Sequence, residues 1–314
     1  MKKIILINCY FGKFPSFFNL FLKSCEANPS VDFLIFSDCK CEHHVSNIIF
    51  KYISFEELRD KIKKKFDFPI TLETPYKLCD YKPAYGYIFE DEIRGYDFWG
   101  NCDIDMLFGD IRSFLTDNLL NKYDKFYQLG HLTLYRNTPS INRIFMNNGY
   151  PCYKDVFTTN KIMVFDETLG IQKKFEEKNI KCYLNRDYAD ISHIYYRFRL
   201  SNQYINIDPK NNNYKYQVFE YNCGHVYRYF IIDKKINRDE FIYIHIQKRI
   251  MKQENNMSDR FFITYDGFKN NIYNNITARD IKALNAYKFT KQLSITCKRS
   301  LNRLKKLFNK LKRE

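Results

Sequence analysis

The first hundred residues alternate short apolar runs with segments of helical periodicity. Ile4 to Ile7 and Val31 to Phe36 have the composition of buried strands, and between them Ser16 can cap a helix whose apolar residues recur at helical spacing. Strands that alternate with helices in this way form parallel β-α-β units, which bind ligands at the carboxyl ends of the strands. The sequence therefore predicts an α/β fold, with functional residues directly after strands.

Local signals extend this prediction along the chain. Ser54 and Glu57 have the spacing of a capping box at a helix start, and Tyr81 to Ile93 has helical periodicity. Farther on, Tyr214 to Tyr221 and His225 to Ile232 have the pattern of two hairpin strands separated by a turn. No low-complexity linker divides the chain, so we expect one α/β domain with a mixed carboxyl half.

Two aspartates, Asp103 and Asp105, stand one residue apart in the segment YDFWGNCDIDMLFGD. Alternate residues of an extended chain point to the same side, so both carboxylates can face one point as the chain leaves a buried sheet. A divalent cation takes oxygen ligands and rarely has a full protein cage when substrate phosphates complete its coordination. A solvated turn is the alternative, but apolar residues flank the pair on both sides, where unpaired carboxylates are costly. The pattern predicts a metal-diphosphate site.

The positive charge of the chain is concentrated at its carboxyl end. The formal net charge is +15, and from Lys288 onward ten basic residues face a single acid, Glu314. A basic surface around the aspartate pair is therefore not expected, which argues against nucleic acid as a partner. Hydrophobic residues make up 45% of the chain and aromatic residues 18%, which excludes general disorder.

The same tail carries apolar residues at steps of three and four between its lysines and arginines, as expected for a basic amphipathic helix. Such a helix either packs on the body of the protein or lies on an anionic membrane surface. Its apolar positions are Leu293, Cys297, Leu301, Leu304, Phe308 and Leu311.

Targeting signals and cysteines indicate the compartment. The apolar run after Lys2 and Lys3 is too short for a signal peptide, and no run approaches the roughly 18 apolar residues that span a bilayer. We expect a cytoplasmic protein, peripheral on the inner face of the cytoplasmic membrane, with its ten cysteines reduced. One loop, CKCEHH, gathers four potential zinc ligands, but the usual distant second arm is missing, which favours an ordinary polar loop. These residues are Cys39, Cys41, His43 and His44.

With these residues in place, the chain resembles bacterial glycosyltransferases of the GT-A fold, and more closely a little-characterised family from capsule and surface-polysaccharide loci. The resemblance runs from Ile4 to about Arg249. It is carried by six blocks in order: CYFGKFPSFF, FLIFSD, PYKLCDYKPAYGYIF, DFWGNCDIDMLFGDI, GHLTLYRN and YIHIQKR. It implies a GT-A-like, Rossmann-like mixed sheet flanked by helices over residues 1–250, with residues 251–314 as an extension that holds the basic amphipathic helix.

The resemblance also implies the partners of the protein. These are a Mn²⁺ or Mg²⁺ ion, a nucleotide-sugar donor, with a UDP-sugar expected, and a lipid-linked or oligosaccharide acceptor such as a growing capsule, O-antigen or lipooligosaccharide. Asp103 and Asp105 match the metal ligands, and His245 matches a late histidine ligand, although alone it fits a structural histidine at a strand end. Lys248 and Arg249 follow closely enough to reach phosphates, although such residues are usually solvated.

Further residues are assigned roles by position in the family blocks. Asp38, at the end of the second strand, resembles a carboxylate that meets the nucleoside, although a turn aspartate fits the same place. Asp80 and Lys82 lie in a segment that contacts nucleotide or donor sugar in related enzymes, and local helix punctuation is the alternative.

The catalytic base is expected at Asp166 and Glu167, which match an Asp-Glu block of the family. An inverting transferase needs a group that takes the proton of the acceptor hydroxyl, whereas a retaining one does not. The pair also fits helix N-terminal acids favoured by the helix dipole, and Thr168 stands where the family has an aromatic residue. Possible acceptor-side residues, which fit a buried core strand equally well, are His131, Tyr135 and Arg136.

Two other classes of function remain as alternatives. A nucleotidyltransferase or nuclease would also use a divalent cation, but the chain has no glycine-rich phosphate loop. A non-enzymatic membrane scaffold would use only the tail, and the intact aspartate pair with His245 argues against it.

Overall fold

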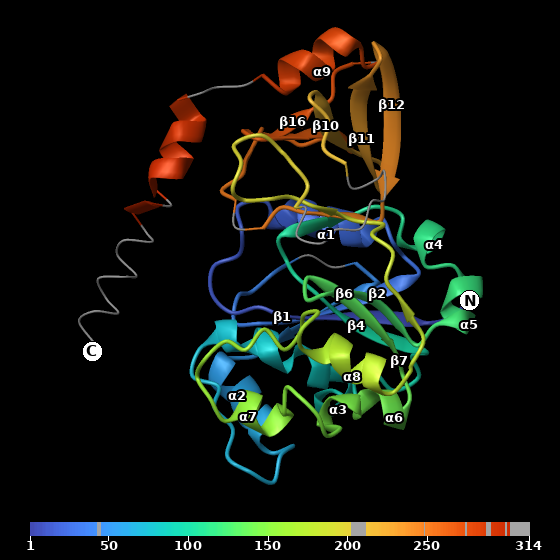
Figure 1. Ribbon diagram of the computed structural model, residues 1–314, viewed down its shortest axis with the longest axis vertical. Helices are drawn as coiled ribbons and strands as arrows, with labels where there is room; N and C mark the ends of the chain where they lie inside the picture. Colours follow the sequence, from blue (N-terminus) through green and yellow to red (C-terminus); the bar gives the residue numbers. More distant parts are fainter. Residues whose placement is uncertain are drawn as a thin grey trace. The chain divides into compact units, whose positions relative to one another are not determined.

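The computed structural model describes residues 1–42, 45–201, 212–247, 249–273, 275–286, 290–298 and 300–301 (Figure 1). The chain forms two compact units, one of residues 1–104 and 110–186 and the other of residues 105–109 and 187–314. The chain passes from the first unit to the second between Ile104 and Asp105, inside the aspartate pair. Residues on both sides of the boundary expected at residue 250 belong to the second unit, and that boundary stays a prediction.

The first unit is built on a mixed sheet whose order, among the described residues, is β3-β2-β1-β4-β7-β6-β8. β1 pairs in parallel with β2 and β4, and β2 in parallel with β3, whereas β7 is antiparallel to both β4 and β6. This confirms the predicted α/β class, a large mixed sheet flanked by helices, consistent with a GT-A-like fold. The strands are β1 (Ile4–Cys9), β2 (Val31–Ser37), β3 (Ile48–Tyr52), β4 (Phe98–Cys102), β6 (Lys125–Leu129), β7 (Leu132–Arg136) and β8 (Cys182–Tyr183).

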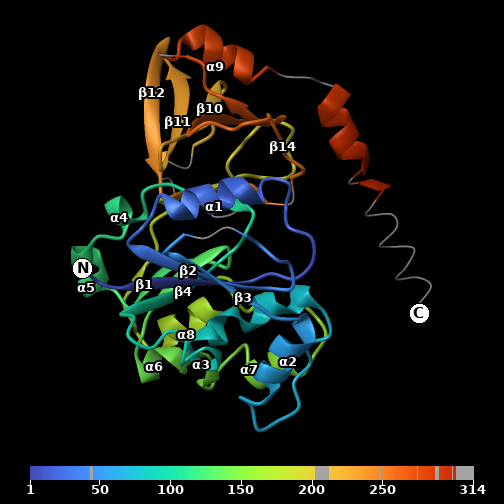
Figure 2. The ribbon, with the colours of Figure 1, turned by 180° about the vertical axis from the view of Figure 1, so that it is seen from behind.

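Helices cover both faces of this sheet. Figures 1 and 2 show α1 (Phe18–Glu26) on one face and the other large helices of the unit on the opposite face. The main core lies against this second layer, because alternate strand residues such as Ile5, Ile7 and Trp99 point to it. The helices there are α2 (Phe55–Lys63), η1 (Pro75–Ala84), α3 (Tyr85–Ile88), α6 (Pro139–Asn142), α7 (Tyr153–Phe157) and α8 (Ile171–Glu177). Short elements η2 (Ile144–Met146), α4 (Ile111–Phe114) and α5 (Asp117–Lys122) complete the unit.

The capping box at Ser54 is confirmed, whereas the cap expected at Ser16 and the long helix expected from Tyr81 are wrong. The Ser54 capping box is present, with the side chain accepting from the Glu57 amide. The first helix is capped at Phe17 without a side-chain hydrogen bond, so Ser16 is not its cap. The helix expected from Tyr81 to Ile93 is instead the end of the 3-10 helix η1, which contains Pro83, followed by a single turn, α3.

Among its described residues, the second unit holds two smaller sheets. β5 (Met106–Phe108), directly after the aspartate pair, is antiparallel to β13 (Tyr243–His245), which is parallel to β9 (Ala189–Asp190). The other sheet has the order β12-β11-β10-β15-β16-β14, and α9 (Ala278–Leu284) lies beside it (Figure 2). Ile281 of α9 packs against Val218 and Phe262 of this sheet. Its strands are β10 (Gln217–Asn222), β11 (His225–Ile232), β12 (Lys235–Phe241), β14 (Lys252–Gln253), β15 (Arg260–Thr264) and β16 (Gly267–Asn270).

The predicted hairpin is confirmed as β10 and β11. Asn222 pairs with His225, so the loop between them has two residues. Cys223 and Gly224 both have positive φ, 47° and 87°, as the primed turns that match strand twist require.

The basic tail is described only in part. Residues 290–298 and 300–301 are helical, and Leu293 and Leu301 are 52% and 57% exposed. The remaining apolar positions of the predicted amphipathic helix, Leu304, Phe308 and Leu311, lie outside the described residues, as do His43 and His44 of the polar loop. Of the helices that the structure describes, none is long and apolar enough to cross a membrane.

Candidate functional site

The predicted strand-end positions of Asp38 and Asp103 are confirmed. Asp38 follows β2 and Asp103 follows β4, and β1 pairs in parallel with both strands. The amide of Asp103 donates to the carbonyl of His131, 2.9 Å away. The exposed Asp38 accepts a hydrogen bond from the amide of Gly12, which has φ +96°. Both carboxylates therefore stand at one edge of the sheet, where ligands of parallel sheets bind.

Lys82 joins Asp103 to Asp166, and we call these three residues the lysine cluster. The Nζ of Lys82 lies 2.7 Å from Asp103 Oδ1 and 3.3 Å from Asp166 Oδ2, and it donates to the carbonyl of Gly130 at 2.8 Å. Burial alone would lower the pKa of Lys82, but the two carboxylates outweigh it and raise that pKa above its usual value. The ammonium thus stays charged. It bridges Asp103, an expected metal ligand, and Asp166, an expected catalytic base.

Gly130 leaves the space that the Asp166 carboxylate occupies. A Cβ atom on Gly130 would stand 2.1 Å from Asp166 Oδ2, so any side chain there would displace the carboxylate. The amide of Gly130 also hydrogen-bonds to the carboxylate of Glu167. Gly130 was not singled out from the sequence, although it begins one of the family blocks.

Burial raises the pKa of both candidate base carboxyls. Burial raises the pKa of Asp166 to about 6, with Lys82 opposing the rise. Burial, together with the neighbouring Asp166 carboxylate, raises the pKa of Glu167 to about 7. A carboxylate with such a pKa is a better proton acceptor at neutral pH than an ordinary one.

Asp80 holds the segment that leads to these carboxyls. Its Oδ2 and Oδ1 accept from the amides of Met163 and Phe165, each at 2.9 Å, and the buried Lys77 ammonium lies 2.8 Å from Oδ2. Lys77 also donates to the carbonyls of Val156 and Lys161. The Asp80 carboxylate is fully buried, and both its oxygens are occupied by these protein groups, so it positions a loop.

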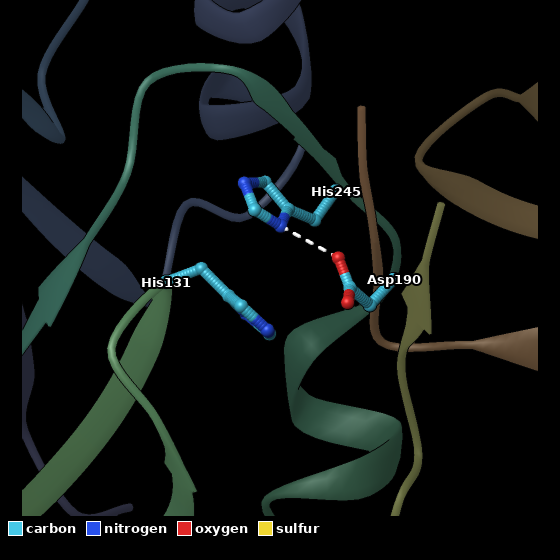
Figure 3. A group of neighbouring side chains, drawn as sticks. All are labelled: His131, Asp190 and His245. Atoms are coloured by element: carbon cyan, nitrogen blue, oxygen red, sulfur yellow. Dashed lines mark hydrogen bonds and ion pairs between the residues drawn. The ribbon is translucent and has the colours of Figure 1, made fainter. Parts of the chain in front are cut away.

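The second unit contributes a histidine cluster of Asp105, Asp190 and His245. Nε2 of His245 lies 3.2 Å from Asp105 Oδ1, and Nδ1 lies 2.9 Å from Asp190 Oδ1, the bond drawn in Figure 3. The Asp105 carbonyl accepts from the amide of Ile246, which ties Asp105 to the end of β13. Burial opposes the charged imidazole, but the two carboxylates outweigh it and raise the pKa of His245 to about 10.

The donor groups fit a divalent cation. Asp105 and His245 are among the side chains whose ligand atoms lie close enough to share an ion, and Asp103 is two residues before Asp105 in the chain. Carboxylates suit Mg²⁺ and Mn²⁺, and an imidazole nitrogen among them favours Mn²⁺, the ion more tolerant of nitrogen. An imidazole binds a metal only in its neutral form, so the cation would replace the proton on His245 Nε2.

Other predicted site residues have different surroundings. Lys248 lies outside the described residues. Arg249 donates to the carbonyls of Ser192 and Tyr195, and burial lowers its pKa to about 10, so this guanidinium is committed to a loop of its own unit. Tyr135 stacks on Trp99 at 4.5 Å in the core, Arg136 is paired with Asp124 at 2.6 Å, and His131 is buried beside β7.

The chain belongs to DUF6625, a family of unknown function, whose model matches residues 6–272. No curated protein matches the sequence. Among solved structures, the fold of this chain is similar to that of the galactosyltransferase LgtC, which was solved in complex with donor and acceptor sugar analogues. The similarity covers 59% of this chain and 75% of LgtC, with 14% sequence identity and a TM-score of 0.36. A likeness of this size indicates neither substrate nor mechanism.

Proposed function

We propose that this member of a family of unknown function is a metal-dependent glycosyltransferase, which moves a sugar from a nucleotide-sugar donor to a growing surface glycan. The observation that carries the proposal is the meeting of Asp105 Oδ1 with His245 Nε2 at the end of β13, two residues after Asp103. Two carboxylates and one imidazole suit a divalent cation and would leave its other coordination positions for a diphosphate.

The donor is bound, in this proposal, by the carboxyl ends of β2 and β4. Asp38 meets the nucleoside, and Asp103, Asp105 and His245 hold Mn²⁺ or Mg²⁺. A cation held by these residues would supply Lewis-acid stabilisation of the nucleoside diphosphate as it leaves. Lys82 adds positive charge beside Asp103. The sequence-based role of Lys248, contact with the phosphates, stays a prediction. A UDP-sugar is the expected donor.

The reaction breaks the bond between the sugar C1 and the diphosphate oxygen and forms a bond between C1 and the acceptor oxygen. The electron pair of the broken bond leaves with the nucleoside diphosphate. The proton of the acceptor hydroxyl passes to a carboxylate if the configuration is inverted, and we assign this role to Glu167, with Asp166 beside it. Support comes from the raised pKa values of both carboxyls and from the Lys82 link between Asp166 and Asp103.

This assignment predicts the pH dependence of transfer. A base must be deprotonated, so kcat/KM should rise with pH through an apparent pKa near 7, the value to which burial raises the pKa of Glu167. Glu167→Gln should lower kcat about 100-fold or more and remove this rise of kcat/KM with pH. Glu177→Gln, the same change at the end of helix α8, should leave the pH profile intact. An unchanged rise of kcat/KM with pH in Glu167→Gln would exclude it as the base.

The basic tail is proposed to dock the enzyme on an anionic membrane that carries a lipid-linked acceptor, at the inner face of the cytoplasmic membrane. Removing residues 288–314 should abolish the binding of the protein to anionic vesicles, because each basic residue near such a surface contributes roughly 1 kcal/mol, less at high salt. Transfer to a soluble acceptor analogue should be unaffected. Flotation of the truncated protein with vesicles, or its unfolding, would contradict the membrane role.

A panel of nucleotide sugars, tested for binding with and without Mn²⁺, tests the proposed function. We expect one nucleotide sugar to raise the midpoint of thermal unfolding only when Mn²⁺ is present. Binding of free nucleoside triphosphates in preference to every nucleotide sugar would instead favour the nucleotidyltransferase alternative.

A further inference from the structure

The backbone presents Asp190 to His245 independently of any metal. β9 and β13 are parallel neighbours in which His245 stands opposite Asp190, and the amide of Ile191 donates to the His245 carbonyl at 2.9 Å. Two backbone segments thus hold the pair side by side. The side chains of both residues are nearly buried, 12% exposed for Asp190 and 11% for His245, so the contact is shielded from water.

The hydrogen bond between them determines which ring nitrogen can bind a metal. Nδ1 of His245 lies 2.9 Å from Asp190 Oδ1, and a carboxylate at this distance accepts a proton from the ring. Nε2 faces the Asp105 carboxylate at the longer distance of 3.2 Å, and a cation bound to that carboxylate would take the place of the Nε2 proton, so the hydrogen of the neutral imidazole would stay on Nδ1. Figure 3 shows that Nε2 points away from Asp190. This is the nitrogen that meets Asp105.

Asp190 is itself held by Gln247. The amide nitrogen of Gln247 donates to the same Asp190 oxygen at 2.8 Å, and its carbonyl oxygen lies 2.7 Å from His193 Nδ1. A carboxylate oxygen accepts only, which orients the amide and leaves its carbonyl to accept from His193. The chain of contacts runs from His193 through Gln247 and Asp190 to His245.

We propose that Asp190 is a positioning residue for the metal site: it sets the tautomer and the ring orientation of His245 so that Nε2 is presented to the divalent cation. Gln247 keeps the Asp190 carboxylate in place. The inference rests on the proposed function, because it requires His245 to be a ligand, and it adds how that ligand is prepared. Carboxylates behind a ligating histidine typically change metal affinity 10- to 100-fold.

Manganese titration of the full-length protein, with free Mn²⁺ measured by electron paramagnetic resonance, tests the inference without any assay of transfer. Asp190→Asn, which keeps the volume, should weaken Mn²⁺ binding about 10- to 100-fold. Gln247→Ala should weaken it in the same direction and by less. Glu240→Gln is the matched control, because Glu240 pairs with His225 at 2.7 Å in the same unit and should leave the affinity unchanged.

The possible failures are distinguishable. Wild-type affinity in Asp190→Asn together with lost affinity in His245→Ala would overturn the inference and leave the metal site standing. Wild-type affinity in His245→Ala would overturn the metal site and the inference together. A second readout is the ¹⁵N spectrum of labelled histidine with Zn²⁺ as a diamagnetic probe, in which we expect His245 to bind through Nε2 with a proton on Nδ1. Binding through Nδ1 would contradict the proposal, whatever the stability of the variants.

Discussion

Asp105→Asn is expected to lower the rate of glycosyl transfer on the order of a thousandfold while the protein remains folded. The amide keeps the volume of the carboxylate but removes an anionic metal ligand, and the loss of about 4 kcal/mol of leaving-group stabilisation corresponds to that factor. The hydrogen bond from Ile246 to Asp105 uses the backbone carbonyl, so the substitution leaves the tie to β13 intact. Initial rates at saturating Mn²⁺ provide the measurement. Asp103→Asn should have a similar effect.

The control for this substitution lies a few residues farther along the same segment. Asp110 caps α4 by accepting from the amides of Arg112 and Ser113, and asparagine is an equally good cap. Asp110→Asn should therefore retain wild-type rates and wild-type dependence on Mn²⁺. Normal turnover by both Asp103→Asn and Asp105→Asn would exclude the aspartate pair as the metal site.

Lys77→Met is expected to lower the free energy of unfolding by about 3 to 5 kcal/mol, because it leaves the Asp80 carboxylate buried without its counter-ion. It also removes the hydrogen bonds to the carbonyls of Val156 and Lys161. Urea unfolding followed by the fluorescence of Trp99 measures this loss. Trp99 is the only tryptophan in the sequence, and it is fully buried in the first unit.

A pair of the same spacing serves as the control. Lys63 and Asp60 are also three residues apart, but both are exposed and 4.0 Å separates their charged atoms. Lys63→Met should change the free energy of unfolding by no more than about 0.5 kcal/mol. The double variant Lys77→Met with Asp80→Asn should be more stable than Lys77→Met alone, since no charge is then left unpaired. Equal effects of Lys77→Met and Lys63→Met would show that the buried pair does not hold the loop.

The parts of the fold that the sequence predicted are those with local signals. The β1 and β2 strands are mostly apolar because they are buried on both faces. The hairpin turn needs positive φ at two adjacent residues, and Gly224 supplies one of them without steric cost. The helix expected from Tyr81 is mostly absent, since its buried residues Tyr81, Ala84, Tyr85 and Ile88 lie on a 3-10 helix and one α-helical turn. Apolar periodicity reports burial and does not distinguish between these kinds of helix.

The sequence pointed to candidate site residues mainly where they are close to one another along the chain. Asp103 and Asp105 form a visible pattern, whereas Asp190 is 55 residues from the histidine it contacts and carries no motif of its own. Asp80 was expected to contact the donor, but its partners Met163 and Phe165 lie 83 and 85 residues away. The role of Gly130 depends on the distance to Asp166, which no spacing in the sequence reveals. Such contacts are set by how the strands and loops pack in three dimensions.

The most direct test of glycosyl transfer is the identity of the product released from a nucleotide-sugar donor in the presence of Mn²⁺. Mass spectrometry of the reaction should find nucleoside diphosphate, together with an acceptor whose mass has increased by one dehydrated sugar. Cleavage then lies between the sugar and the diphosphate, as the proposed reaction requires. Release of nucleoside monophosphate and sugar phosphate would place the cleavage within the diphosphate and contradict the assignment of a glycosyltransferase.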